Sequence, residues 1–126
     1  MATLIDPNFR ARLNALNDKY AAGVPDLLAA IARALARCHA EGCAGEAAVA
    51  LHKSLHAVAG SAGTFGFAAL GQECRRLEHL LRALLERGAD GAAGWPALDA
   101  EVVFLLDWAG KDARSGAPAS ATVRFV

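Results

Sequence analysis

The chain has 126 residues, with 13 basic and 13 acidic side chains and no formal net charge. This length fits one domain with a single core, and hydrophobic residues make up 55% of it. The balanced charge gives no electrostatic attraction to nucleic acid or to an anionic membrane, which excludes both classes of partner.

Two helices are predicted in the first third of the chain. Asp6 and Pro7 suit the start of the first helix. Asp caps free backbone amides, and Pro lacks the backbone N–H that would have no partner at the first helical position. This helix is expected to end near Gly23. The second is expected to start around residues 24–26 and to stop at Gly42. Their apolar faces carry Phe9, Leu13, Leu16 and Tyr20, and then Leu27, Leu28, Ile31, Leu35 and Cys38.

Three further helices follow. The third runs from about Gly45 to Ala62, and a turn over residues 63–66 leads to the fourth. The fourth is the clearest amphipathic helix, with apolar residues at alternating steps of three and four. Its apolar stripe is Phe67, Leu70, Cys74, Leu77, Leu81 and Leu84, and its polar side is Arg75, Arg76, Glu78, His79, Arg82 and Glu86. A loop rich in glycine and alanine over residues 88–94 precedes the fifth helix, which begins near Trp95. It is expected to bury Leu98, Val102, Leu105 and Trp108, all before Lys111.

No segment alternates between apolar and polar residues with period two, so the predicted fold class is all-α. Short connections favour antiparallel neighbours, which predicts an antiparallel up-and-down four-helix bundle made of the last four helices. The additional N-terminal helix is expected to act as a lid on one end. The bundle domain is assigned to residues 1–113, and residues 114–126, rich in Ser, Gly, Pro and Ala, are expected to form a flexible C-terminal tail.

The three cysteines, Cys38, Cys43 and Cys74, are an odd number without the spacing of a zinc motif. We expect them to be reduced thiols and expect no metal site made from them. The amino terminus lacks the pattern of a signal peptide, and no apolar run is long enough to span a bilayer. These features predict a cytoplasmic protein.

His56 lies late in the third helix, away from the residues expected to face the core. At about 100° per residue, it stands roughly 120° from the centre of the apolar stripe, so its imidazole is predicted to be exposed to solvent. The core stripe is Leu51, Leu55, Val58 and Ala62, and the neighbours of His56 by helical spacing are Ala59, Gly60 and Gly63, with His52 and Lys53 on the preceding turn. The two glycines either admit the backbone of another molecule or help to end the helix.

A set of spaced residues carries a family resemblance. It consists of His56, Gly60, Ser61, Ala62, Phe65 and Gly66, followed by an amphipathic helix with Leu70, Cys74 and the Leu77-Glu78 pair. From Leu55 to about Arg87 the chain resembles the histidine phosphotransfer (HPt) domain of bacterial two-component relays. The resemblance implies a helical bundle in which His56 accepts a phosphoryl group from a receiver-domain aspartate and passes it to another receiver. At one position the chain departs from many family members, which carry Lys where it has Ala59.

The resemblance also implies roles for the neighbours of His56. Neutral imidazole is a nucleophile near neutral pH, and the chain has no phosphate-binding loop of Walker type. The protein is therefore expected to be a phosphorelay intermediate rather than an enzyme. No cofactor is expected, because the partner receiver supplies the catalytic groups and Mg²⁺. The implied partners are a response-regulator receiver domain and a hybrid sensor histidine kinase, and a monomer is expected. Gly60 would admit the receiver, Lys53 would supply the charge missing at Ala59, and Ser61 would contact the phosphoryl oxygens or bond back to its own helix.

Two other functions compete with this interpretation. His52 and His56 are spaced i, i+4 and lie on one helix face, which is also typical of a metal-binding bundle. Glu78 or His79 on the next helix would then supply a further ligand. The other alternative is a non-catalytic helical adaptor that binds a receiver or a kinase, and it is favoured by Ala59 in place of the usual basic residue.

Overall fold

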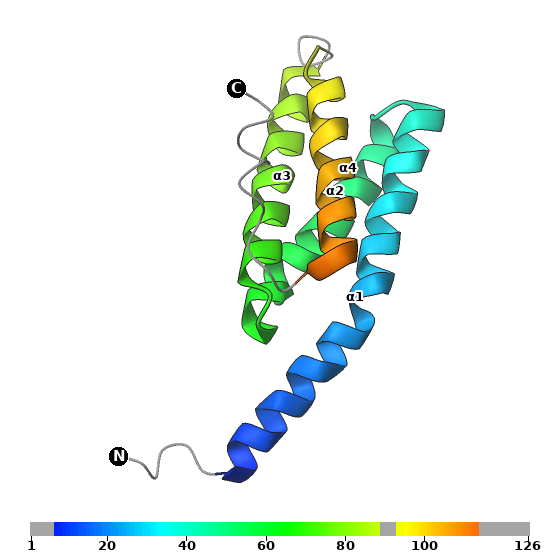
Figure 1. The fold of residues 1–126 in the computed structure, drawn as a ribbon. Helices are drawn as coiled ribbons and strands as arrows, with labels where there is room; N and C mark the ends of the chain where they lie inside the picture. The colour runs from blue at the N-terminus through cyan, green and yellow to red at the C-terminus, as the bar shows by residue number, and fades with distance from the viewer. Residues whose placement is uncertain (1–6, 89–92, 114–126) are drawn as a thin grey trace.

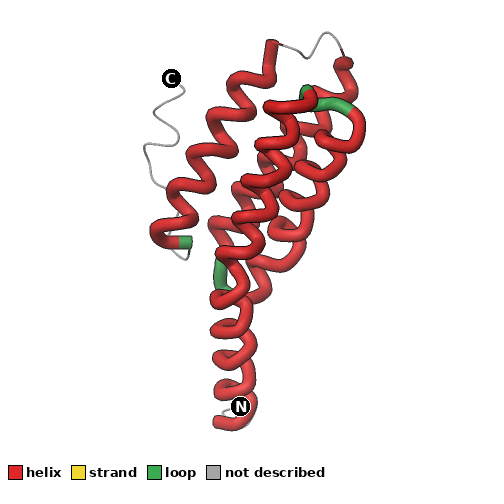
Figure 2. Tube along the Cα trace, turned by 90° about the vertical axis from the view of Figure 1, so that its right-hand side faces the viewer, coloured by secondary structure: helices red, strands yellow, loops and turns green. Residues whose placement is uncertain are grey.

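The computed structural model describes residues 7–88 and 93–113, and its regular elements there are all helical (Figures 1 and 2). They are α1 (Pro7–Glu41), α2 (Gly45–Ser61), the 3-10 turn η2 (Ala62–Phe65), α3 (Ala68–Arg87) and α4 (Trp95–Asp112). The predicted all-α helical bundle is confirmed. No helix within these two ranges is both long and apolar enough to cross a membrane. The predictions for Asp6 and for the tail over 114–126 lie outside the described residues.

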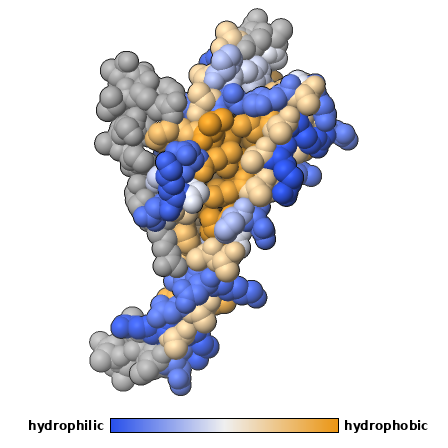
Figure 3. Space-filling model, turned by 45° about the vertical axis from the view of Figure 1, so that its right-hand side comes forward, coloured by the Kyte–Doolittle hydropathy of each residue, from blue (hydrophilic) through white to orange (hydrophobic). Residues whose placement is uncertain are grey.

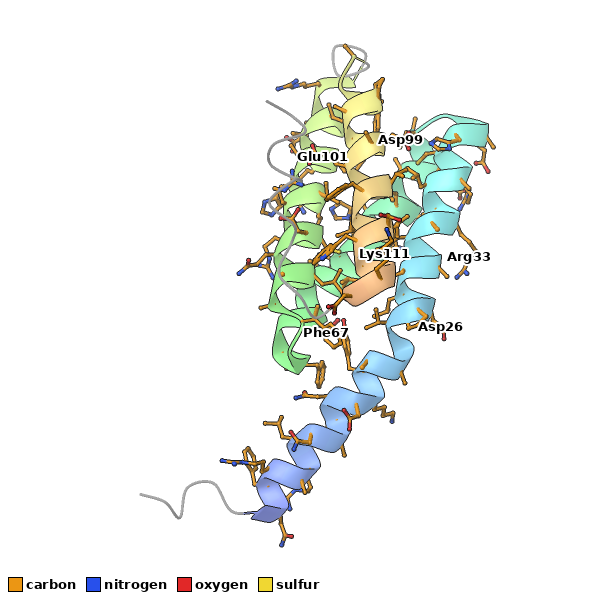
Figure 4. The ribbon with its side chains drawn as sticks, in the orientation of Figure 1. Asp26, Arg33, Phe67, Asp99, Glu101 and Lys111 are labelled. Carbon is orange, nitrogen blue, oxygen red and sulfur yellow. The ribbon has the colours of Figure 1, made fainter. Side chains whose placement is uncertain are left out.

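The helix α1 is continuous for 35 residues with Pro25 inside it, so the predicted helix end near Gly23 is wrong. Proline removes one backbone donor and its ring presses on the carbonyl four residues earlier, which can bend a helix without ending it. Figure 1 shows α1 changing direction where it joins the bundle, and Asp26, labelled in Figure 4, lies close to this bend. The N-terminal half of α1 therefore projects away from the bundle, and the predicted lid is wrong as well (Figure 2).

One apolar core lies between the four helices. Each of them contributes side chains that have no exposed surface. These include Ile31 from α1, Leu51, Leu55 and Val58 from α2, Leu70, Cys74, Leu77 and Leu81 from α3, and Val102 from α4. All six residues predicted for the apolar stripe of the fourth helix are buried. Hydrophobic periodicity therefore identified the inward face of α3 correctly, because this face is wide and continuous.

The turn between α2 and α3 holds these two helices close together. Gly66 has a φ of +93°, a backbone conformation that favours glycine. The amide of Phe67 donates to the carbonyl of Ala62 at 2.8 Å. A Cβ atom at Gly71 would lie 3.3 Å from the backbone nitrogen of Gly63, so the missing side chain at Gly71 lets α3 begin directly against the turn.

The opposite side of the bundle, between α1 and α4, is more open. There the Nε2 atom of His39 lies 2.7 Å from Oδ1 of Asp99, which joins the end of α1 to the start of α4. Beside this pair is a cavity of about 260 Å³ lined mainly by apolar side chains, including Leu35, Trp95 and Leu98. Figure 3 shows the apolar surface that is exposed between these two helices.

Two substitutions of the same type test whether the N-terminal half of α1 packs on the bundle. Leu77 has no exposed surface, whereas Leu16 is 52% exposed on the projecting part of α1. Leu77→Ala is expected to lower the free energy of unfolding by about 2–5 kcal/mol, because it leaves a cavity in the core. Leu16→Ala should cost less than about 1 kcal/mol. Urea denaturation measures both, and an equal loss for the two variants would show that α1 folds back in solution.

Candidate functional site

His56 lies on the outer face of α2, as predicted, with 68% of its side chain exposed. The core side of α2 is formed by Leu51, Leu55 and Val58, which have no exposed surface. Because His56 stands well away from this stripe on the helix, the same periodicity that buries the leucines leaves the imidazole in solvent. The outer face of α2 therefore offers an accessible histidine near the end of the helix.

A carboxylate from the neighbouring helix holds one edge of this imidazole. Oε2 of Glu78, on α3, lies 2.5 Å from Nδ1 of His56, and only 5% of the Glu78 side chain is exposed. The prediction that Glu78 lies on the polar side of its helix is wrong. Glu78 follows Cys74 by four residues and precedes Leu81 by three, so it shares their inward face where α3 meets α2. A carboxylate is buried there because the imidazole gives it a hydrogen-bond partner.

This contact determines which nitrogen of His56 is free. An ionised carboxylate only accepts hydrogen bonds, so Nδ1 must carry the proton and donate it to Glu78. In a neutral imidazole the other nitrogen, Nε2, then carries the lone pair. The exposed edge of the ring is thus a nucleophile in a defined orientation and tautomer.

His52 and Arg82 extend this arrangement around Glu78. Nε2 of His52 lies 3.3 Å from Oε2 of Glu78, and the rings of His52 and His56 stack with centroids 6.1 Å apart. Nη2 of Arg82 lies 3.9 Å from the same carboxylate oxygen and 3.5 Å from Nε2 of His52. His52 is less accessible than His56, because only 27% of its side chain is exposed. The role of Arg82 was not predicted, although its i, i+4 spacing from Glu78 was a signal for it.

The geometry also bears on the metal-binding alternative. Glu78 does approach both His52 and His56, whereas His79 is exposed on α3. Within the part of the chain that the structure describes, however, no group of three or more His, Cys, Asp or Glu residues is arranged to hold a metal ion. Glu78 is thus better described as the hydrogen-bond partner of His56 than as a ligand beside it.

The residues predicted to share the open face with His56 divide into two groups. Lys53, Gly60 and Gly63 are exposed, Lys53 and Gly60 on α2 and Gly63 in η2. Ala59, in contrast, is only 8% exposed, so its predicted place on this face is wrong. It follows Leu55 by four residues and therefore belongs to the core stripe.

Arg75 brings a positive charge to the backbone of α2, a position that the sequence did not indicate. Its Nη2 atom donates to the backbone carbonyl of Ala59 at 3.0 Å, and the residue is otherwise exposed. This hydrogen bond carries a guanidinium group from α3 to the backbone of α2, one turn after His56. A cation thus lies beside the position at which the HPt resemblance would place lysine.

Ser61 is engaged on the opposite side of α2. Its hydroxyl donates to the carbonyl of Ala57 at 2.7 Å, as in the alternative in which Ser61 bonds back to its own helix. The hydroxyl of Tyr20, which stacks on Phe65 at 4.9 Å, lies 2.8 Å from Oγ of Ser61. Ser61 therefore joins α2 to α1 and does not face His56.

The comparisons with known proteins agree with this geometry. The family model for the Hpt domain matches residues 16–108, which is most of the chain. Neither a curated protein nor a solved structure matches it significantly. The matched range includes the α2 and α3 residues that form the site.

The tautomer of His56 is directly measurable. Nitrogen-15 NMR of the ring is expected to show the proton on Nδ1, which is the less common form for a free histidine. Glu78→Gln should keep this tautomer, because the amide oxygen still accepts the hydrogen bond from Nδ1. Glu78→Ala removes the acceptor, so the proton should no longer be restricted to Nδ1. Glu86→Gln, an exposed position on the same helix, is the control. A neutral His56 that carries its proton on Nε2 in the unsubstituted protein would contradict the assigned geometry.

Proposed function

This chain belongs to the Hpt domain family, and from that premise we propose that His56 is the residue that accepts and donates the phosphoryl group. Hpt domains take part in phosphorelays as intermediates and not as catalysts. We further propose that the group arrives from the receiver aspartate of a hybrid sensor histidine kinase and leaves to the receiver of a response regulator. Lys53, Gly60 and Gly63 are the neighbours expected to contact these receivers.

The observation that supports His56 most is an imidazole with 68% of its side chain exposed, held at Nδ1 by Glu78, which leaves Nε2 free of that contact. In the transfer, the Nε2 lone pair forms the bond to phosphorus while the bond to the aspartyl oxygen breaks, and the carboxylate leaves with that electron pair. No proton has to leave Nε2. The ring then carries a proton on Nδ1 and a phosphoryl group on Nε2, and the adjacent carboxylate of Glu78 compensates the positive charge that develops on it.

Besides a free nucleophile, this chemistry requires charge stabilisation around the transferred phosphoryl group. We propose that Lys53 and Arg75 supply it from this chain, on either side of the exposed face of α2. The hydrogen bond from Arg75 to Ala59 supports this role, because it fixes a cation near the backbone position where many family members carry lysine. The receiver supplies its bound Mg²⁺ and the aspartate.

The chemistry also requires that the receiver domain approach His56 closely, and Gly60 provides the space for this. A Cβ atom built at Gly60 meets no atom of this protein within 4 Å, so packing inside the bundle does not demand a glycine there. A glycine near the end of a helix costs about 1 kcal/mol relative to alanine. We propose that this cost is offset by the space it leaves for a receiver loop beside the imidazole.

His56→Gln tests the assignment of the phosphoacceptor. The variant is expected to take no label from receiver domains phosphorylated at their aspartate, and its helical circular dichroism should not change, because the side chain lies mostly in solvent. His79→Gln, an exposed histidine on α3, is the control and should accept label normally. Labelling of the His56→Gln variant would overturn the proposal. Binding of a phosphorylated receiver to the unsubstituted protein without transfer would favour the adaptor.

Gly60→Ala separates folding from partner contact. The free energy of unfolding should rise by up to about 1 kcal/mol, because alanine is the better helix former and has room. The rate of phosphotransfer should fall on the order of 10- to 100-fold, because a misplacement of about 1 Å at the reacting atoms has an effect of this size. Gly110→Ala on α4 also meets no atom, and it is expected to leave transfer unchanged. A Gly60→Ala variant with normal transfer would show that this glycine only serves the helix end.

A further inference from the structure

Two of the three cysteines are in contact at the end of the bundle where α1 gives way to α2. Cys38 lies in the last turn of α1 and Cys43 in the connection, and their Sγ atoms are 2.7 Å apart. Between them, Gly42 has a φ of +85°, and its amide donates to the carbonyl of Cys38 at 2.9 Å. This backbone turn closes the helix and returns the chain, which brings the second thiol onto the first.

The surroundings give the two sulfur atoms different access. Cys38 is 7% exposed and its thiol donates to the carbonyl of Ala47, whereas Cys43 is partly exposed and donates to Cys38. Both line the cavity of about 260 Å³ between α1, α2 and α4. Neither thiol belongs to a metal-binding group among the described residues.

We propose that Cys38 and Cys43 are a modification site at which a hydroperoxide forms a reversible disulfide between the last turn of α1 and the connection to α2. The sulfur of Cys43, as the more accessible thiolate, attacks the peroxide oxygen to give a sulfenic acid and releases an alcohol, or water from hydrogen peroxide. The Cys38 sulfur then attacks the sulfenic sulfur and water leaves. Each sulfur is oxidised by one electron, and the peroxide bond takes up both electrons.

Burial controls how readily this oxidation begins. Burial, and then the hydrogen bond to Cys38, raise the pKa of the Cys43 thiol above its ordinary value. The reactive thiolate is thus scarce near neutral pH, so the pair is oxidised more slowly than an exposed cysteine. The neighbouring sulfur then makes the second step fast, because it is already in contact with the first. Cys74 has no exposed surface, and burial raises its pKa to about 12, which makes it an internal control.

The disulfide is separate from the phosphotransfer site. His56 lies eleven residues beyond the first residue of α2, which corresponds to about 16 Å along the helix axis. Oxidation is therefore expected to stabilise the α1–α2 connection, as a cross-link does by restricting the unfolded chain, and to leave the exposed imidazole unchanged. The proposal does not depend on the proposed function of His56.

Peptide mapping of the full chain tests the proposal. The protein is treated with hydrogen peroxide, denatured, alkylated and cleaved with trypsin. Cys38 and Cys43 fall in one tryptic peptide, residues 38–53, and Cys74 falls in another, residues 54–75. The first peptide is expected to lose the mass of two hydrogen atoms and to take no alkyl group, and dithiothreitol should reverse both changes. The Cys74 peptide should be fully alkylated.

Variants provide the second measurement. Oxidation should raise the midpoint of thermal unfolding of the unsubstituted protein and of Cys74→Ser, but not that of Cys43→Ser. Any of three results would overturn the proposal. These are full alkylation of both thiols after treatment with hydrogen peroxide, a sulfinic acid on Cys43 without the cross-link, and a disulfide between two chains. The mapping uses the unsubstituted protein, so it remains decisive if Cys43→Ser folds poorly.

Discussion

The arrangement of the site depends on one hydrogen bond, between the buried carboxylate of Glu78 and Nδ1 of His56. A carboxylate that is 5% exposed needs partners, and the imidazole supplies the closest of them. In return, the ring is held in one orientation and in the tautomer that leaves Nε2 unprotonated. A histidine on the outside of a helix would otherwise rotate freely, so this single contact turns an exposed side chain into a positioned nucleophile.

The contact in turn requires that α2 and α3 lie close together. The turn at Gly66 and the missing side chain at Gly71 allow α3 to begin against η2, which sets the spacing of the two helices at that end. Glu78 lies two turns further along α3, opposite His56. Gly66 and Gly71 thereby allow the Glu78 carboxylate to lie level with the His56 imidazole along the two helices. The backbone geometry of the turn thus affects the tautomer and orientation of His56 on α2.

Much of the fold was predictable from the sequence, because it follows from apolar periodicity along each helix. The wrong predictions concern positions that are decided by packing between helices. The stripe of α3 and the exposure of His56 were correct, since both follow from angles around one helix. Glu78 and Ala59 were misplaced because a charge was assumed to face water and an alanine was assumed to be open, whereas the packing of α2 on α3 decides both. The predicted end near Gly23 and new start at residues 24–26 are wrong, because the helix continues through Pro25 to side chains that are buried in the core. Contacts between helices therefore contain the information that one helical wheel lacks.

The two ends of α2 have different chemistry, and the helix itself separates them. At its start, Cys38 is buried and Cys43 is partly exposed, and burial raises the pKa of the Cys43 thiol, an environment that slows the proposed oxidation. Near its end, His56 is open to solvent, with 68% of its side chain exposed and a glycine on the following turn. Because His56 lies about 16 Å along the helix axis from the first residue of α2, the proposed cross-link is expected to stabilise the bundle at the first end without altering the second. The proposed disulfide would therefore change the stability of the bundle independently of the proposed transfer of phosphoryl groups.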